Sequence, residues 1–321
     1  MNTVLILGAN GRFGAAAVQA FAAAGWQVLA QVRRAPAAPL PARAEAIELP
    51  LTEPAALAER GRGASVVDYA VNPPYTRWDT EMMPLSRQGL DVARRLGARF
   101  MLPGNVYNYG EGMPALLLES TPERPTTPKG RQRVEMEAEL DASGLDSVVI
   151  RAGDFFGGGS GSWFDLAIVK DIRKGKLVYP GSLDLAHAWA YLPDLAQAFV
   201  AVAAREPVRG IERLNFEGHT LTGREFMAAL EHEATALGLL PANGFRQGGM
   251  PWGLIRAIGL VHPMMRELAR MSYLWRVPHG LEGRALRRRA GALQSTPLGT
   301  ALHQSLLDLG LGRAAALSLQ A

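Results

Sequence analysis

Three glycines near the start of the chain have a spacing that suits a phosphate-binding turn. Gly8, Gly11 and Gly14 form the pattern G-x-x-G-x-x-G in the segment GANGRFG. In such a turn the first glycine permits the tight bend, the second lets the backbone approach a pyrophosphate, and the third lets a helix pack closely on a strand. The start of that helix then faces the phosphates. The pattern predicts dinucleotide binding, with a purely structural turn as the alternative. The predicted contact residues are Gly8, Asn10, Gly11, Arg12, Phe13 and Gly14.

The residues after the second expected strand bear on which dinucleotide binds. An acidic residue about 20 positions beyond the glycine turn would select NAD through its ribose hydroxyls. This sequence has Arg33 and Arg34 there, with no carboxylate. Two guanidinium groups, with Arg12 as a third, could receive a 2′-phosphate, which predicts NADP(H) as the cofactor over NAD(H). The alternative is that Arg33 and Arg34 are solvated residues at a strand end. Ala70, in the apolar run 65–71, is a further expected cofactor contact.

The amino-acid composition and charge exclude several kinds of site and partner. The 321 residues carry a net charge of +4 and include no cysteine, which excludes disulfides, thiolate metal sites and a cysteine nucleophile. The histidines show no metal-binding spacing such as H-E-x-x-H, so no metal is predicted. The arginines are scattered apart from the run 287–289, and no nucleic-acid partner is expected. No stretch reaches the roughly 18 apolar residues that cross a membrane. We expect no membrane association and a cytoplasmic location.

Strand and helix patterns alternate along the first half of the chain. The apolar runs expected as strands are 3–7, 27–32, 44–49, 65–71, 99–102 and 147–151, and the segments expected as helices are 13–24, 80–96 and 131–142. Alternation of this kind predicts an α/β fold with a doubly wound parallel Rossmann sheet, whose functional strand ends share one edge. After Arg151 the alternating pattern gives way to a glycine-rich loop at 157–161 and then to shorter elements rich in Trp, Met and Pro. We therefore expect a dinucleotide domain at 1–153 with a strand returning near 211–216, and a smaller, mainly helical substrate or cap domain at 154–210 and 217–321.

Several segments resemble the extended and atypical short-chain dehydrogenase/reductase superfamily, also called the NAD-dependent epimerase/dehydratase family, over nearly the whole length. The glycine turn is the family's pattern. The other matching segments are 106–110 with the "VYG" turn, 149–157 with "lRpgnvyG", 187–196 with "hvdDla" and 295–298 with "TPleeaL". The resemblance implies an NAD(P)-binding Rossmann fold.

The chain departs from this family at the catalytic positions. The family's enzymes carry a Tyr-x-x-x-Lys pair on the helix after the "VYG" turn, with Ser or Thr just before that turn. Here Lys129 stands where the tyrosine is expected, Arg133 where the lysine is expected, and Pro103 where the serine is expected. Arg133 could still hydrogen-bond the nicotinamide ribose. Lys129 could donate a proton if desolvation and Arg133 lowered its pKa, or it could be an exposed lysine without a role.

Other groups could take over the chemistry. The amide of Asn105 could orient a carbonyl group. Tyr107 follows the fifth strand, on the functional edge, and could supply the missing acid, with packing in the turn as the alternative. His187 and Tyr191 are spaced for the same side of a strand and could be acid or base, although a structural histidine fits better. Asp194, directly after Pro193, is expected to cap the N-terminus of a helix.

Three functions fit these features. The first is an NADP(H)-dependent oxidoreductase of atypical short-chain dehydrogenase type, acting on a small apolar or aromatic carbonyl, imine or activated alkene. The second is a nucleotide-sugar epimerase or dehydratase, although the segment 183–186 lacks the arginine that such enzymes usually place there. The third is a non-catalytic NADP(H)-binding redox sensor, resembling the regulators of nitrogen metabolite repression. The expected partner is a small-molecule substrate, with a homodimer by analogy to the family.

Overall fold

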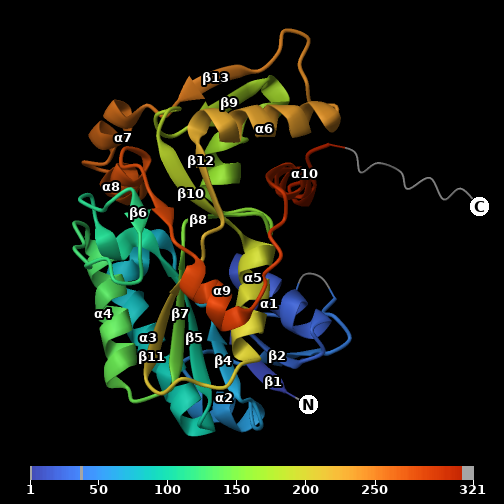
Figure 1. Ribbon diagram of the computed structural model, residues 1–321, viewed down its shortest axis with the longest axis vertical. Coiled ribbons are helices and arrows are strands. Elements are labelled where there is room, and N and C mark those ends of the chain that lie inside the picture. Colours follow the sequence, from blue (N-terminus) through green and yellow to red (C-terminus); the bar gives the residue numbers. More distant parts are fainter. Residues whose placement is uncertain (1, 37–38, 313–321) are drawn as a thin grey trace, which may run out of the picture.

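The computed structural model describes residues 2–36 and 39–312, and its centre is a seven-stranded sheet (Figure 1). The strand order is β11-β7-β5-β4-β1-β2-β3, and all neighbours are parallel. The strands are β1 (Thr3–Leu7), β2 (Gln27–Val32), β3 (Ala44–Glu48), β4 (Val66–Tyr69), β5 (Arg99–Asn105), β7 (Ser147–Ala152) and β11 (Ile211–Asn215). The order reverses between β1 and β4, which is where doubly wound sheets bind ligands. The predicted α/β Rossmann fold is confirmed.

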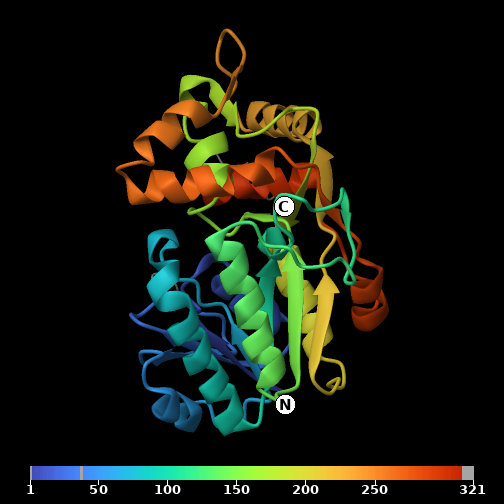
Figure 2. The same cartoon turned by 90° about the vertical axis from the view of Figure 1, so that its left-hand side faces the viewer.

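Helices cover both faces of this sheet. They are α1 (Arg12–Ala23), α2 (Pro54–Arg60), α3 (Trp78–Leu96), α4 (Pro128–Ala142), α5 (Leu192–Ala203) and α9 (Arg284–Ala290). Side chains alternate along each strand, so Val4 and Ile6 of β1 join the core under α1 and α5, while Leu5 and Leu7 join the core under α2, α3 and α4. Burial on both faces explains why the strands read as continuous apolar runs. Figure 2 shows α3 and α4 side by side in front of the sheet.

Helix α5 differs from two expectations. It lies within the range expected for the cap, yet it packs on the sheet against α1, with the rings of Phe13 and Phe199 4.8 Å apart. The prediction that Asp194 caps this helix is wrong. The helix begins at Leu192, because the fixed φ of Pro193 suits the first helical turn. Asp194 therefore lies inside that turn and accepts hydrogen bonds from the backbone nitrogen (2.8 Å) and hydroxyl (2.6 Å) of Thr296.

The second part of the molecule, called the cap below, lies over the carboxyl edge of the sheet (Figure 1). It combines small sheets with helices around an aromatic core. Its strands are β8 (Asp154–Phe156), β10 (Ala186–Tyr191) and β12 (His219–Thr222) in one sheet, and β9 (Lys176–Tyr179) with β13 (Arg246–Gly249) in another. Its helices are η3 (Phe164–Ile168), η4 (Ile172–Lys174), α6 (Gly223–Ala236), α7 (Trp252–Ile258), α8 (Pro263–Met271), η5 (Ser272–Trp275) and α10 (Leu298–Asp308).

Short elements join the two parts. The pair β6 (Leu116–Leu117) and β14 (Gly280–Leu281) forms a small parallel sheet, and the turns η1 (Tyr75–Arg77) and η2 (Val106–Tyr109) follow β4 and β5. Both turns therefore stand at the carboxyl edge, where the sheet meets the cap. Across residues 2–36 and 39–312, no helix combines the length and apolar character that crossing a membrane requires.

Candidate functional site

The glycine turn joins β1 to α1 at the point where the strand order reverses. Gly8 adopts a φ of +82°, a conformation that side chains disfavour. A Cβ atom on Gly14 would overlap the carbonyl oxygen of Gly8 and lie 2.9 Å from the Cα of Ala9, so only glycine lets the helix approach this closely. Gly11 brings no side chain to cap α1, and the amides of the first helical turn are left for an anion. This is the geometry of a pyrophosphate cradle.

Residues from two neighbouring strands shape this cradle. Ala70 follows β4 beside the turn, because a Cβ on Gly8 would lie 3.2 Å from the carbonyl carbon of Ala70. The buried amide of Gln31, from β2, accepts a hydrogen bond from the backbone of Gly8 (2.9 Å) and donates one to the carbonyl of Leu49 (2.6 Å). Gln31 therefore fixes the turn against the sheet. This role could not be predicted from the sequence, because a single glutamine within an apolar strand matches no motif that indicates a function.

The three arginines expected around a 2′-phosphate do not come together. Arg33 and Arg34 follow β2 and are exposed, and the side-chain amide of Asn10 donates to the backbone carbonyl of Arg34 (2.9 Å). Arg12 instead donates from Nη2 to the carbonyl of Gly157 (2.7 Å), in the loop after β8 of the cap. Burial lowers the pKa of Arg12, and Asp165 partly offsets this effect. Arg12 therefore ties the start of α1 to the cap.

Lys129 is deeply buried, so the alternative of an exposed lysine is wrong. Only 2% of its surface is accessible, because η1 and α8 cover the start of α4. Its ammonium donates to the carbonyl of Tyr75 (2.7 Å) and pairs with Glu267 of α8 (2.7 Å). It also lies 4.3 Å from the centre of the Tyr75 ring and 5.1 Å from that of Trp78. The ammonium is therefore enclosed by one carboxylate, one carbonyl oxygen and two aromatic rings.

Arg133 lies one helical turn further along α4 and is buried without an oxygen acceptor in the described part of the chain. Its Nη1 contacts the sulfur of Met136 at 3.9 Å, its guanidinium lies 5.0 Å from the Trp78 ring, and its Nε has no partner. Burial lowers its pKa, opposed by Tyr107 and Glu137 among others. An unpaired buried cation costs folding free energy that a bound oxygen ligand would recover. The donors of Arg133 thus remain available for such a ligand.

Asn105 is the last residue of β5, and Tyr107 lies two residues further on, in the η2 turn. The side-chain oxygen of Asn105 accepts from the backbone nitrogen of Tyr107 (3.0 Å), which holds the η2 turn. The phenol of Tyr107 interacts with that of Tyr75. Burial, followed by the nearby carboxylate of Asp154, raises the pKa of Tyr107 to about 12. Tyr107 is therefore a neutral phenol at ordinary pH, which can donate a proton but not accept one at its oxygen without help.

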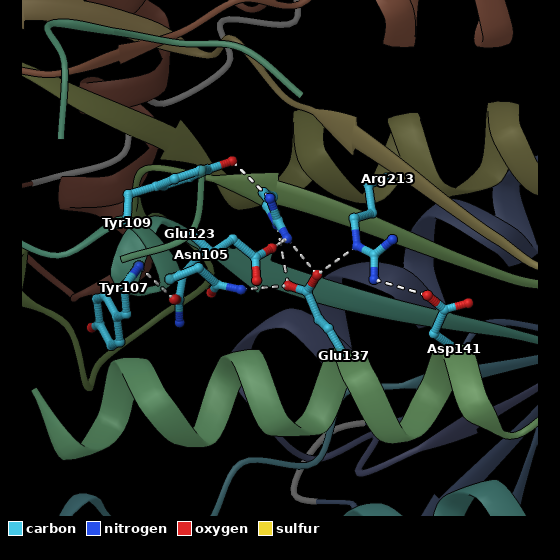
Figure 3. A network of polar contacts seen from close by, with 9 residues as sticks. Asn105, Tyr107, Tyr109, Glu123, Glu137, Asp141 and Arg213 are labelled. Atoms are coloured by element: carbon cyan, nitrogen blue, oxygen red, sulfur yellow. Dashed lines mark hydrogen bonds and ion pairs between the residues drawn. The ribbon is translucent and has the colours of Figure 1, made fainter. Parts of the chain in front are cut away.

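A buried ionic network behind η2 holds this region in place (Figure 3). Glu137 of α4 accepts hydrogen bonds from Asn108 (3.0 Å), from Nε of Arg151 in β7 (3.1 Å) and from Nε of Arg213 in β11 (3.2 Å). Arg151 also donates to the phenol of Tyr109 (2.8 Å) and pairs with Glu123. The network connects α4, two strands and the turn that carries Tyr107. Its members lie far apart in the sequence, so local patterns gave no sign of it.

A second polar pair lies in the cap. Nε2 of His187 in β10 is 2.9 Å from Oδ2 of Asp154 in β8, and His187 is only 3% exposed. Its ring stacks on Trp275 at a centroid distance of 4.3 Å, with 4° between the planes. Tyr191 packs against Phe156 in the cap core, at a centroid distance of 5.3 Å. Sequence reasoning singled out His187 but missed its partner, because the two residues meet only when β8 pairs with β10. Among the residues described, no three His, Asp or Glu side chains gather into a metal-binding group.

The chain is similar to several solved structures over nearly its whole length. MoeE5 in complex with UDP-glucose and NAD is 18% identical, covers 96% of this chain and 98% of its own, and superposes with a TM-score of 0.72. A UDP-glucose 4-epimerase from Thermotoga maritima with UDP-glucose is 14% identical, with coverages of 95% and 98% and a TM-score of 0.73. TunA, an NAD-dependent NDP-hexosamine 5,6-dehydratase of tunicamycin biosynthesis, is 18% identical, with coverages of 96% and 97% and a TM-score of 0.69.

At these identities the likeness shows a shared fold. No curated protein matches the chain. The model of one family matches residues 4–215, from β1 through the glycine turn and α4 to β11. The chain belongs to the NAD dependent epimerase/dehydratase family.

Proposed function

We propose that this protein is a nicotinamide-dependent enzyme of the epimerase or dehydratase type, acting on a nucleotide-activated sugar. The observation that carries the proposal is the cradle at residues 8–14, where Gly14 leaves no room for a side chain and the start of α1 is uncapped. The related structures support the substrate class, since MoeE5 was solved with UDP-glucose and with UDP-glucuronic acid, and TunA is an NDP-hexosamine dehydratase. The comparisons do not support the small apolar or aromatic substrate that the sequence favoured. We therefore propose a nucleotide sugar as the substrate.

The residues around the cradle fit a dinucleotide. The amides at the start of α1 would hold the pyrophosphate, Ala70 would line the turn, and Arg133 would offer its free donors to the nicotinamide ribose. When bound, the nicotinamide ring accepts or supplies a hydride at the carbon that reacts. Ala70 and Val71, which follow β4, line the turn on the other side, since a Cβ on Gly8 would lie 3.1 Å from Cγ2 of Val71 and 3.2 Å from the carbonyl carbon of Ala70.

The choice between the two nicotinamide cofactors is a finer proposal. Related structures contain NAD, among them that of MoeE5. The preference for NADP(H) now rests on the exposed Arg33 and Arg34 alone, because Arg12 is engaged with Gly157. Two guanidinium groups still suffice to receive a 2′-phosphate. We retain NADP(H) as the alternative that a direct titration decides.

For the proton, we propose Tyr107 as the donor. Its phenol stays neutral, and its position after β5 lies on the edge where ligands bind in sheets of this kind. The amide nitrogen of Asn105 is free to orient the reacting oxygen, since only its oxygen is used by the turn. The ammonium of Lys129 already pairs with Glu267 and donates to the carbonyl of Tyr75, which opposes a role as proton donor to the substrate.

The first experiment is a titration of the pure protein with NADH and with NADPH, followed by nicotinamide fluorescence, on the wild type and on Arg33→Ala and Arg34→Ala. Loss of NADPH affinity in those variants, with NADH affinity unchanged, would establish the 2′-phosphate site. Equal binding of both cofactors in all three proteins would remove the NADP(H) preference. Absence of binding by either cofactor would overturn the proposed function.

The second experiment tests turnover. Protein loaded with the preferred cofactor is incubated with UDP-glucose, UDP-glucuronic acid and thymidine diphosphate glucose, and the sugars are separated by chromatography. A new sugar nucleotide that Tyr107→Phe fails to form would support the proposal. Tight cofactor binding without turnover of any sugar would favour the silent redox sensor instead.

A further inference from the structure

The turn between α7 and α8 exposes apolar side chains that the proposed function does not use. We infer that the α7–α8 hairpin, residues 252–271, binds the surface of a lipid bilayer with anionic headgroups, and that its turn lies at the boundary between headgroups and acyl chains. The inference does not depend on the proposed reaction. It replaces the expectation of no membrane association, which rested on the lack of a segment long enough to cross. A hairpin that lies in the interface needs no such segment.

Four apolar side chains of the hairpin are open to solvent. Leu254 and Ile258 are 59% and 39% exposed and lie one helical turn apart on α7. Leu260 and Val261, in the turn itself, are 80% and 83% exposed, which makes them the most exposed large apolar residues in the described part of the chain. Figure 2 shows this turn, between the two orange helices, projecting at the left-hand edge of the cap. Adjacent exposed apolar side chains on a projecting turn indicate an interaction site.

The backbone of the turn is already hydrogen-bonded within the hairpin. The amides of residues 259–262 all donate to carbonyls of α7, at distances between 2.8 and 3.2 Å, and Pro263 has no amide hydrogen. The guanidinium of Arg266 donates from Nε to the carbonyl of Gly259 (3.0 Å) and from Nη2 to that of Leu260 (3.3 Å). An unpaired backbone group is costly in an apolar phase. The turn can therefore leave water without leaving these groups unpaired.

The charge around the turn is positive and complements anionic headgroups. The hairpin carries three exposed arginines, Arg256, Arg266 and Arg270, and a single carboxylate, that of Glu267. Glu267 is buried and pairs with both Lys129 and Arg270, each at 2.7 Å, so it adds little negative charge to the surface. Within the described ranges, neither Arg256 nor Arg266 forms an ion pair. Arginines on this hairpin can reach lipid phosphates while the apolar side chains lie deeper.

A fluorescent label at the turn tests the contact directly. The chain has no cysteine, so Val261→Cys gives the full-length protein one site for an environment-sensitive fluorophore. On vesicles of equal parts phosphatidylglycerol and phosphatidylcholine, we expect its emission to move to shorter wavelength and to be quenched by nitroxide-bearing acyl chains. Vesicles of phosphatidylcholine alone should give neither change. An unchanged label on the anionic vesicles would overturn the proposal.

The matched control for the label is Val208→Cys. Val208 is also exposed, but it precedes β11 at the amino edge of the sheet, opposite the cap. A label there should report water with or without vesicles. If the labels at 208 and 261 were quenched equally, adsorption would not be directed by the hairpin and the proposal would be wrong.

Unlabelled variants test the two contributions by vesicle flotation. Leu260→Asp should weaken binding to the anionic vesicles by about tenfold or more, because a carboxylate resists leaving water. Val208→Asp makes the same change in charge at the far end of the molecule and should leave binding unchanged. Arg256→Gln should weaken binding by about fivefold. All three side chains are exposed, so circular dichroism should show an unchanged fold. Equal affinities of Leu260→Asp and Val208→Asp would refute insertion of the turn.

A second copy of this chain is the rival occupant of the turn. Sedimentation velocity of the wild type and of Leu260→Asp, without lipid, tests it. A dimer that Leu260→Asp dissociates, in a protein that binds neither kind of vesicle, would overturn the proposal in favour of a contact between copies. All these measurements use cofactor-free protein, so their outcome is separate from whether any sugar nucleotide turns over.

Discussion

The buried ion pair between Lys129 and Glu267 gives the sharpest prediction about stability. Its ammonium nitrogen and carboxylate oxygen are 2.7 Å apart, and the two side chains are 2% and 11% exposed. At an effective dielectric constant of about 20, a separation of 2.7 Å corresponds to a gross attraction of about 6 kcal/mol. Desolvation offsets much of that attraction, but removal of one partner from a buried pair typically costs about 3–5 kcal/mol, because the other charge stays buried alone.

The two partners should not be equivalent. Glu267→Gln leaves Lys129 with the carbonyl of Tyr75 and two aromatic rings, and we expect the full loss of about 3–5 kcal/mol in the free energy of unfolding. Lys129→Met leaves Glu267 paired with Arg270 at 2.7 Å, so the loss should be smaller, about 1–3 kcal/mol.

Urea denaturation followed by tryptophan fluorescence and circular dichroism measures both losses. The control is Glu45→Gln, which breaks the exposed pair with Arg60 and should cost less than about 1 kcal/mol. If Glu267→Gln cost no more than Glu45→Gln, or if Lys129→Met proved the more damaging change, the reasoning from burial and residual pairing would be refuted.

Three further predictions concern the cofactor and pH. Gly14→Ala should weaken NADH binding at least tenfold, because its Cβ overlaps the carbonyl of Gly8, whereas Gly112→Ala, which meets nothing within 4 Å, should bind normally in the same fluorescence titration. Arg133→Met should weaken NADH and ADP-ribose by about 10–100-fold, as loss of hydrogen bonds from a charged group implies, while leaving ADP unchanged in calorimetry; equal weakening of ADP would contradict ribose contact. Burial lowers the pKa of His279 from 6.5 to about 4 in the folded protein. Between these two pH values the imidazole is protonated in the unfolded chain and neutral in the folded chain. Stability should therefore fall by about 3 kcal/mol as pH drops through this interval, and His279→Gln should remove that slope in urea denaturation; an unchanged slope would refute it.

The features that could be predicted from the sequence depend on residues that lie close together along the chain. Gly8, Gly11 and Gly14 and the alternating apolar runs act within a few residues, so residue types and their spacing were enough to predict both the cradle and the sheet. Side-chain pairing over long distances could not be predicted in this way. The partner of Arg12 lies 145 residues away and the partner of His187 lies 33 residues away. The first contact depends on how the cap folds over the sheet and the second on how β8 pairs with β10, and periodicity encodes neither.

The contact between Arg12 and the loop after β8 has a thermodynamic consequence. Arg12 is the first residue of α1, beside the amides that would meet the pyrophosphate, and its guanidinium reaches the carbonyl of Gly157 in the cap. If a pyrophosphate bound at the start of α1 changes the free energy of the Arg12–Gly157 contact, then nucleotide binding is coupled to the conformation of the cap loop. Coupling of this kind is reciprocal, so a ligand that reorders the cap loop must alter the affinity for the dinucleotide by the same factor.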